Sequence, residues 1–137
     1  MQERRENVIV KKSEKFADRI IKMCKYLSKK KTGDKDMINQ IYRSGTSVGA
    51  NVAESQYAQS RADFLTKMTI ALKEANETHY WLGRLNSCGI LTEKEYESIN
   101  IDSEEIIKLL TSITGTVKNG WARVIIITHY SLLITHY

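Results

Sequence analysis

Residues 43–55 read RSGTSVGANVAES, and this stretch decides how the middle of the chain folds. It contains two Gly, three Ser and one Thr, so a turn, a phosphate-binding loop and a closely packed helix face are the alternatives. Neither GxxxxGK(S/T) nor GxGxxG occurs here, which excludes the phosphate-binding loop. A helix over about residues 35–56 is favoured over a turn because a core-type stripe continues at spacings of three and four through Ile38, Ile41, Gly45, Val48 and Val52.

The small residues of this helix are predicted to form a close-packing face. An interior Gly costs about 1 kcal/mol relative to Ala in a helix, so a compensating contact is expected. A second helix that approaches closely would supply that contact, and the sequence leaves open whether it belongs to the same chain or to a neighbour. The face consists of Ser44, Gly45, Ser47, Gly49, Ala50 and Ala53.

Helical periodicity extends over three other segments, at about residues 12–31, 61–88 and 93–118. The chain has no Pro, which favours long uninterrupted helices. Four amphipathic helices with short connections predict an all-α fold, an antiparallel up-down-up-down four-helix bundle. We expect this bundle to form a single domain over residues 1–119.

The predicted helix ends carry residues that suit them. Gly33 is expected to end the first helix in the left-handed conformation, and Asp34 is expected to cap the second. The sequence SRAD at 60–63 resembles a capping box, and TEKE at 92–95 is a full one. The third and fourth helices are therefore predicted to begin at these points.

Residues 120–137 break the pattern and are predicted to lie outside the bundle. Ile-Thr-His-Tyr occurs there twice, seven residues apart, after the β-branched run VIII. An appended strand, an oligomer contact and a translated tandem nucleotide repeat are the alternatives. We favour the repeat because the segment has strand propensity but no hairpin partner.

Positive charge is concentrated near the N-terminus. Residues 1–35 carry twelve Lys and Arg against five Asp and Glu, whereas the remaining residues carry nine against eleven. This asymmetry favours an anionic partner at one face, with simple solubility as the alternative. Lys15, Arg19, Lys22 and Lys29 are expected opposite the apolar stripe of the first helix. The candidate nucleic-acid-binding residues are Lys11, Lys12, Lys15, Arg19, Lys22, Lys29 and Arg43.

Five polar residues on the second and third helices are predicted to form a structural ion-pair network between these helices. A functional anion site around Arg43 is the alternative. The five residues are Arg43, Asn51, Glu54, Glu74 and Glu77.

The His and Cys residues do not form a catalytic or metal-binding pattern. His79 is the only His in the predicted bundle, and neither Cys24 nor Cys88 has a second ligand at metal-binding spacing. A Ser nucleophile would lack a suitable His base. The sequence therefore predicts a protein without enzymatic activity, metal or cofactor.

The chain is expected to be soluble and cytoplasmic, with no membrane partner. Its N-terminus, MQERRENVIVKK, lacks the apolar core of a signal peptide. Its most apolar run, VIIITHYSLLI, is too short and too polar to span a bilayer. Two Cys in helical patterns fit a reducing compartment.

The second helix contains the pattern R-S-x-x-S-x-x-A-N-x-A-E, at Arg43, Ser44, Ser47, Ala50, Asn51, Ala53 and Glu54. The third helix adds Phe64, Ala71, Glu77 and Leu82. In these residues the chain resembles, from about Phe16 to Val117, the four-helix-bundle proteins encoded by intervening sequences of bacterial large-subunit ribosomal RNA.

The resemblance implies a bundle that assembles into a ring-like homopentamer and has no catalytic residues. Relatives include the accessory variability determinant of diversity-generating retroelements, a basic pentamer that partners a reverse transcriptase and nucleic acid. The leading hypothesis is a non-enzymatic oligomer that binds nucleic acid (structured RNA, or RNA and DNA) as an accessory to a reverse transcriptase or an rRNA intervening sequence. The alternative is a protein-interaction or scaffold module whose charge serves only solubility.

Overall fold

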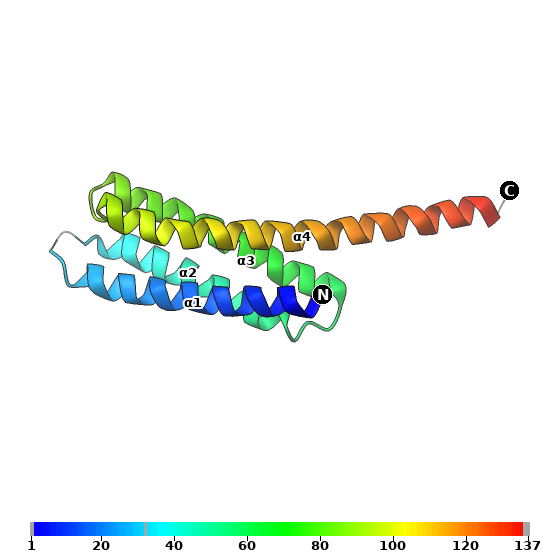
Figure 1. Cartoon of the computed structure of the whole chain (residues 1–137), viewed down its shortest axis with the longest axis horizontal. Helices are drawn as coiled ribbons and strands as arrows, with labels where there is room; N and C mark the ends of the chain where they lie inside the picture. The colour runs from blue at the N-terminus through cyan, green and yellow to red at the C-terminus, as the bar shows by residue number, and fades with distance from the viewer. Residues whose placement is uncertain (1, 32, 136–137) are drawn as a thin grey trace.

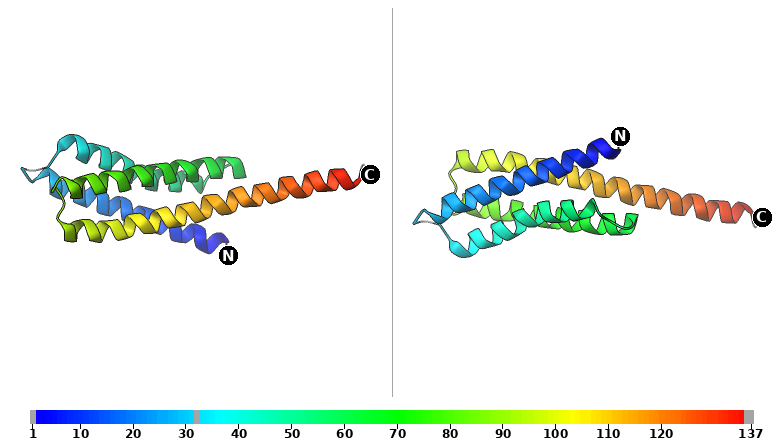
Figure 2. Two further views of the ribbon diagram at one scale, coloured as in Figure 1. Left: turned by 90° about the horizontal axis from the view of Figure 1, so that it is seen from above. Right: turned by 90° about the horizontal axis from the view of Figure 1, so that it is seen from below.

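A computed structural model describes the backbone of residues 2–31 and 33–135 and the side chains of residues 8–31 and 33–120. These residues form four α-helices and no strand (Figure 1). The predicted all-α, antiparallel four-helix bundle is confirmed, and the helices lie side by side in Figure 1 and in both views of Figure 2. They are α1 (Gln2–Ser28), α2 (Lys35–Ser55), α3 (Arg61–Ser87) and α4 (Glu93–Thr135).

Local side-chain bonds begin three of the helices, as the capping patterns predict. The Asp34 carboxylate accepts a hydrogen bond from the Met37 amide at 3.0 Å, and the Ser60 hydroxyl accepts one from the Asp63 amide at 3.0 Å. Before α4 the Thr92 hydroxyl accepts from the Glu95 amide, and the Glu95 carboxylate accepts from the Thr92 amide. Each bond satisfies an amide that has no partner within its helix.

The prediction of a left-handed Gly33 is wrong. Among the described glycines only Gly89, after α3, has a positive φ, of 75°. Gly33 is needed for space, because a Cβ there would lie 2.5 Å from the Leu27 carbonyl oxygen. Lack of a side chain at Gly33 lets the connection pass directly over the last turn of α1.

The apolar stripes of the four helices meet in one continuous core. Of the helix pairs that contact each other, α2 and α3 share the most extensive packing and α1 and α4 the least. The largest side chains at the centre of the core have almost no exposed surface, and burial of such side chains is the main source of bundle stability. They include Phe16, Ile20, Leu27, Ile41, Val48, Val52, Met68, Leu82, Leu85, Ile106 and Leu110.

Two helices are longer than the periodicity predicts. α1 begins at Gln2 instead of about residue 12, and the fully buried Ile9 extends its core stripe. α4 continues to Thr135 instead of ending at about 118, and it projects beyond the other three helices in Figure 1. The appended-strand alternative is therefore wrong, since β-propensity is a weak preference that an uninterrupted helical ladder overrides. Residues 136–137 lie outside the described residues.

The close-packing face of α2 is used within the chain, but only in part. A Cβ at Gly45 would lie 2.8 Å from Ile20 Cγ2, and one at Gly49 would lie 3.3 Å from the Ser13 carbonyl oxygen, so both glycines pack against α1. Ala50 and Ala53 are exposed and do not pack against another helix of this chain, so their place in a close-packing face stays a prediction. They lie on the opposite side of α2 from Val48 and Val52.

Ser44 and Ser47 also differ from each other. The buried Ser44 packs on α3, where the Thr78 hydroxyl donates to the Ser44 oxygen at 2.9 Å. Ser47 is half-buried and its carbonyl accepts from the Asn51 side chain at 2.9 Å. α2 therefore presents glycines to α1 and a hydroxyl to α3.

Among the described residues, no helix has the length and apolar character needed to cross a membrane.

Candidate nucleic-acid interface

Two of the predicted phosphate contacts on α1 are turned toward α4. Arg19 pairs with Asp102 at 2.5 Å and also donates to the Ser98 hydroxyl at 2.9 Å. Lys12 pairs with Glu105. The expectation that Arg19 faces solvent opposite the apolar stripe is therefore wrong. Both cations border the seam between α1 and α4, where direct helix packing is least extensive.

The other predicted basic residues of α1 are exposed, but they differ in their surroundings. Lys11 and Lys15 share their part of α1 with exposed Glu14 and Asp18, which offset their charge. Residues 22–31 contain no Asp or Glu. The segment carries five lysines, which we call the lysine cluster: Lys22, Lys25, Lys29, Lys30 and Lys31.

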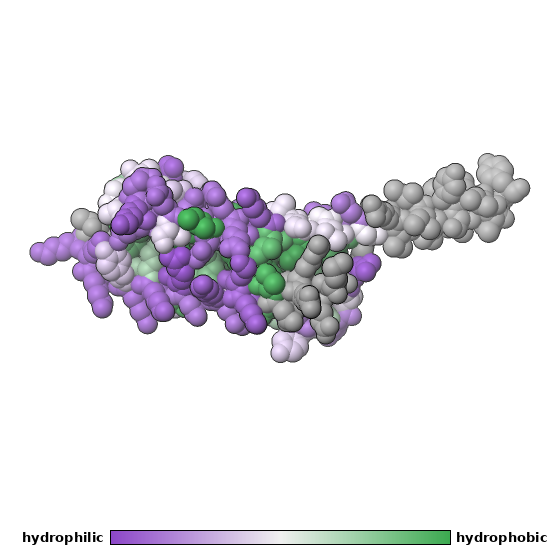
Figure 3. All heavy atoms as spheres, in the orientation of Figure 1, coloured by the Kyte–Doolittle hydropathy of each residue, from purple (hydrophilic) through white to green (hydrophobic). Residues whose placement is uncertain are grey.

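Helical spacing in the sequence indicates Lys22 and Lys29 but not the other three members of this cluster. Lys25 and Lys31 are exposed, and Lys30 is partly exposed. The signal for these three lysines is that the segment KMCKYLSKKK contains no Asp or Glu. Helical spacing does not identify the last lysines, because they lie in the turn after α1. Hydrophilic side chains dominate the visible face along α1, with apolar surface between α1 and α4 in the middle of that face (Figure 3).

Arg43 lies on α2 between two carboxylates of α3. Its guanidinium is 3.3 Å from Glu74 and 2.5 Å from Glu77. Burial raises the pKa of the Glu74 carboxyl, and a hydrogen bond with Glu77 raises it further, while Arg43 acts in the opposite direction. Both carboxylates pair with the Arg43 guanidinium, so Arg43 is not among the phosphate contacts proposed below.

The predicted five-residue polar network divides into separate parts. Asn51 donates to the Ser47 carbonyl of its own helix at 2.9 Å, and Glu54 pairs with Lys67 at 3.0 Å. Only Arg43, Glu74 and Glu77 form one cluster. Asn51 and Glu54 lie about two and three helical turns along α2 from Arg43, beyond the reach of the cluster, and Glu54 meets Lys67 of α3 there instead.

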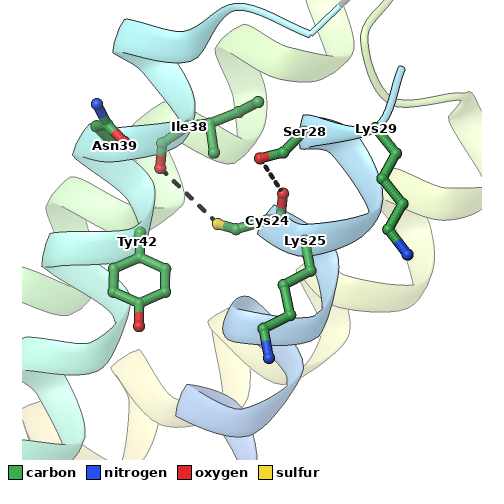
Figure 4. A pocket seen from close by; sticks show the side chains of 7 residues that line it. All are labelled: Cys24, Lys25, Ser28, Lys29, Ile38, Asn39 and Tyr42. Carbon is green, nitrogen blue, oxygen red and sulfur yellow. Dashed lines mark hydrogen bonds between the residues drawn. The ribbon is translucent and has the colours of Figure 1, made fainter.

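Two hollows flank the lysine cluster. The α1–α2 pocket has a volume of about 380 Å³ and is lined by Cys24, Lys25, Ser28, Lys29, Ile38, Asn39 and Tyr42 (Figure 4). The α1–α4 cavity, of about 580 Å³, lies on the other side of α1 and includes Lys22, Tyr26, Lys30 and Glu95 in its wall.

The α1–α4 cavity contains its own charge contacts. The Lys30 ammonium lies 4.3 Å from the centre of the Tyr26 ring, a cation–π contact. A backbone hydrogen bond from Thr92 lowers the pKa of Glu95, so a carboxylate is present in the wall at neutral pH. An anionic ligand would meet this negative charge, whereas the lining of the α1–α2 pocket has lysines and no carboxylate.

The thiol in the α1–α2 pocket is chemically inert. Burial raises the pKa of Cys24 to about 11, so the sulfur stays protonated near neutral pH. It lies 3.8 Å from the Ile38 carbonyl oxygen.

Within the described part of the chain, no three or more His, Cys, Asp or Glu side chains are grouped so that they could hold a metal ion.

Known proteins resemble this bundle in sequence and in fold. Residues 5–112 match the 23S rRNA-intervening sequence protein family. A crystal structure of a protein of unknown function from the S23 ribosomal protein family of Bacteroides thetaiotaomicron is 52% identical, with a TM-score of 0.77. The match covers 81% of this chain and 98% of that one. No curated protein matches. The chain therefore belongs to the 23S rRNA-intervening sequence protein family.

Proposed function

We propose that this protein is a non-enzymatic nucleic-acid-binding protein whose lysine cluster contacts phosphates. The observation that carries the proposal is the acid-free segment 22–31 with its five lysines. Among the described residues, salt bridges engage Lys12, Arg19, Arg43 and Lys67 but no member of the cluster. The family description, which refers to an rRNA intervening sequence, and the description of the solved relative name no enzymatic activity.

Phosphate contacts of this kind give affinity without base specificity. Each neutralised phosphate releases condensed counterions, so the logarithm of the binding constant falls with the logarithm of salt concentration by about 0.9 per contact on duplex DNA and about 0.7 on a single strand. Exposed lysines suit this task because their ammonium groups stay solvated in the free protein. The proposed binding is therefore strongly salt-dependent and weakly selective for sequence.

We also propose that copies of the chain assemble, as the resemblance to ring-like pentamers implies. Exposed apolar side chains on α3 and α4 support this: Ile70, Tyr80 and Ile101 are 37%, 58% and 66% exposed. Repetition of the lysine cluster around a ring would add weak contacts into one tight interaction. Light scattering measures this assembly. An accessory role beside a reverse transcriptase stays a prediction, and a gene for that enzyme beside this one would support it.

Charge neutralisation on α1 tests the proposed function. The triple variant Lys22→Gln, Lys25→Gln, Lys29→Gln should bind a fluorescent single-stranded RNA on the order of a hundredfold more weakly at low salt. Its log–log salt slope should be shallower by about 2 per chain. The cause is the loss of three phosphate contacts, and fluorescence anisotropy measures both quantities.

The matched control removes the same charge elsewhere. Lys73, Lys108 and Lys118 are exposed on α3 and α4, and their replacement by Gln should leave affinity close to that of the parent. Equal losses in both triple variants would show that only net charge matters. No binding by the parent to RNA or DNA would refute the proposal and favour a protein-interaction or scaffold role.

A further inference from the structure

We propose that the α1–α2 pocket receives one unpaired nucleotide of a single strand. Its base stacks on Tyr42, and Lys25 and Lys29 hold the adjoining phosphates. The inference rests on the proposed function and goes further, because it assigns the bound nucleic acid a strandedness and the protein a base-binding site.

The floor of the pocket suits the face and edge of a base. Cys24 and Ile38 form it, with 3% and 6% of their surface exposed, and the raised pKa of Cys24 keeps the thiol neutral. The volume of about 380 Å³ falls within the range of about 300–1,000 Å³ typical of small-ligand sites. A hollow of this size with an uncharged, apolar floor accommodates a flat aromatic group.

Tyr42 provides the aromatic surface. It lies on α2 in the wall of the pocket, and in Figure 4 its ring and the Lys25 side chain extend in the same direction from the two facing helices. Its side chain is 46% exposed, so a ring face is available without any rearrangement of the core. Tyr26, on the other side of α1, is a poorer platform because the Lys30 ammonium lies over its ring.

The charges at the rim favour a phosphodiester. Lys25 lies in the last turn of α1 and Lys29 directly follows the end of the helix; both are exposed and both line the pocket. The lining contains no Asp or Glu to repel a phosphate. The Ser28 hydroxyl already donates its hydrogen to the Cys24 carbonyl at 2.7 Å, whereas the Asn39 amide in the lining can both donate to and accept from a base edge.

Base stacking on one tyrosine requires an unpaired base. In a duplex the base faces are buried between neighbouring pairs, whereas loops and single strands can turn a base outward onto an aromatic ring. The phosphate contacts of the lysine cluster are available to both forms. The pocket therefore adds affinity for single strands alone.

Anisotropy with short oligo(A) RNA and with a duplex RNA of the same length tests this assignment. Tyr42→Ala should weaken binding to the single strand by about tenfold or more and leave duplex binding unchanged. The salt slope should not change, because no phosphate contact is lost. Tyr42→Phe should retain the affinity of the parent, since it keeps the ring. Tyr57→Ala is the matched control, because Tyr57 is 87% exposed after α2, at the other end of the bundle.

A second measurement does not depend on any variant. Irradiation of the parent bound to a 5-bromouridine-substituted single strand should attach the strand to the peptide that contains Tyr42. Adducts confined to other peptides would overturn the inference. So would a Tyr42→Ala variant that binds single strand and duplex like the parent, and in that case a loss of binding in the lysine triple variant would still uphold the proposed function. A parent protein that binds neither form refutes both.

Discussion

Gly45→Ala tests the close contact between α1 and α2. The new Cβ would lie 2.8 Å from Cγ2, 2.9 Å from Cγ1 and 3.1 Å from Cβ of Ile20. These atoms are the branched base of a fully buried side chain, so relief requires the two helices to move apart. Overpacking of this kind costs about 1–3 kcal/mol, whereas Ala gains about 1 kcal/mol in helix propensity over Gly. We expect the variant to be less stable than the parent by about 1 kcal/mol.

Urea unfolding followed by circular dichroism, at one protein concentration, measures this difference. Gly83→Ala is the matched control, because Gly83 lies inside α3 and a Cβ there meets nothing within 4 Å. This control should be more stable than the parent by up to about 1 kcal/mol through propensity alone. The two Gly→Ala changes should therefore have opposite signs.

A double-mutant cycle assigns the effect to Ile20. Ile20→Ala alone should cost about 2–5 kcal/mol by leaving a cavity. In the Gly45→Ala background its cost should be smaller by about 1 kcal/mol, because the truncation also removes the clash. If Gly45→Ala is stabilising to the same extent as Gly83→Ala, or if the two changes at Gly45 and Ile20 are additive, the reasoning is refuted.

Two further predictions concern the acidic cluster and the extended helix. The pKa of Glu74 is raised above 4.5, so near this pH the folded protein still binds a proton that the unfolded chain has released. The bound proton stabilises the folded state, and this stabilisation is lost as pH rises above 4.5 through the raised pKa. Glu74→Gln should remove that loss in unfolding titrations across this range, while a variant with the parent's pH dependence would contradict the assignment. Deletion of residues 121–137 should reduce the total helical signal but leave the thermal midpoint unchanged, because the α4 residues described as buried, such as Ile106 and Leu110, precede the cut. A large drop in midpoint would show that the extension supports the bundle.

The candidate site could be predicted only in part. The sequence indicates a basic α1, and Lys22 and Lys29 are exposed there as expected. It does not show that Arg19 turns to Asp102 on α4, because a small rotation of α1 decides whether a long side chain at the border of the stripe faces solvent or a neighbouring helix. Arg43 was placed correctly beside Glu74 and Glu77, since all three lie on facing helices at matching heights.

By itself, the sequence determined the all-α class, the four helices, the caps of α2, α3 and α4, and the motif of the family. These features depend on residues that are a few positions apart in the chain, and such spacings can be recognised directly in the sequence as periodicity and capping patterns. Only the tertiary structure decided that Gly45 opposes Ile20 and that Tyr42 of α2 lines one pocket with Lys25 and Lys29 at the end of α1. Such contacts depend on how each helix is rotated and shifted against its neighbours, and that is set by the packing of the whole core at once.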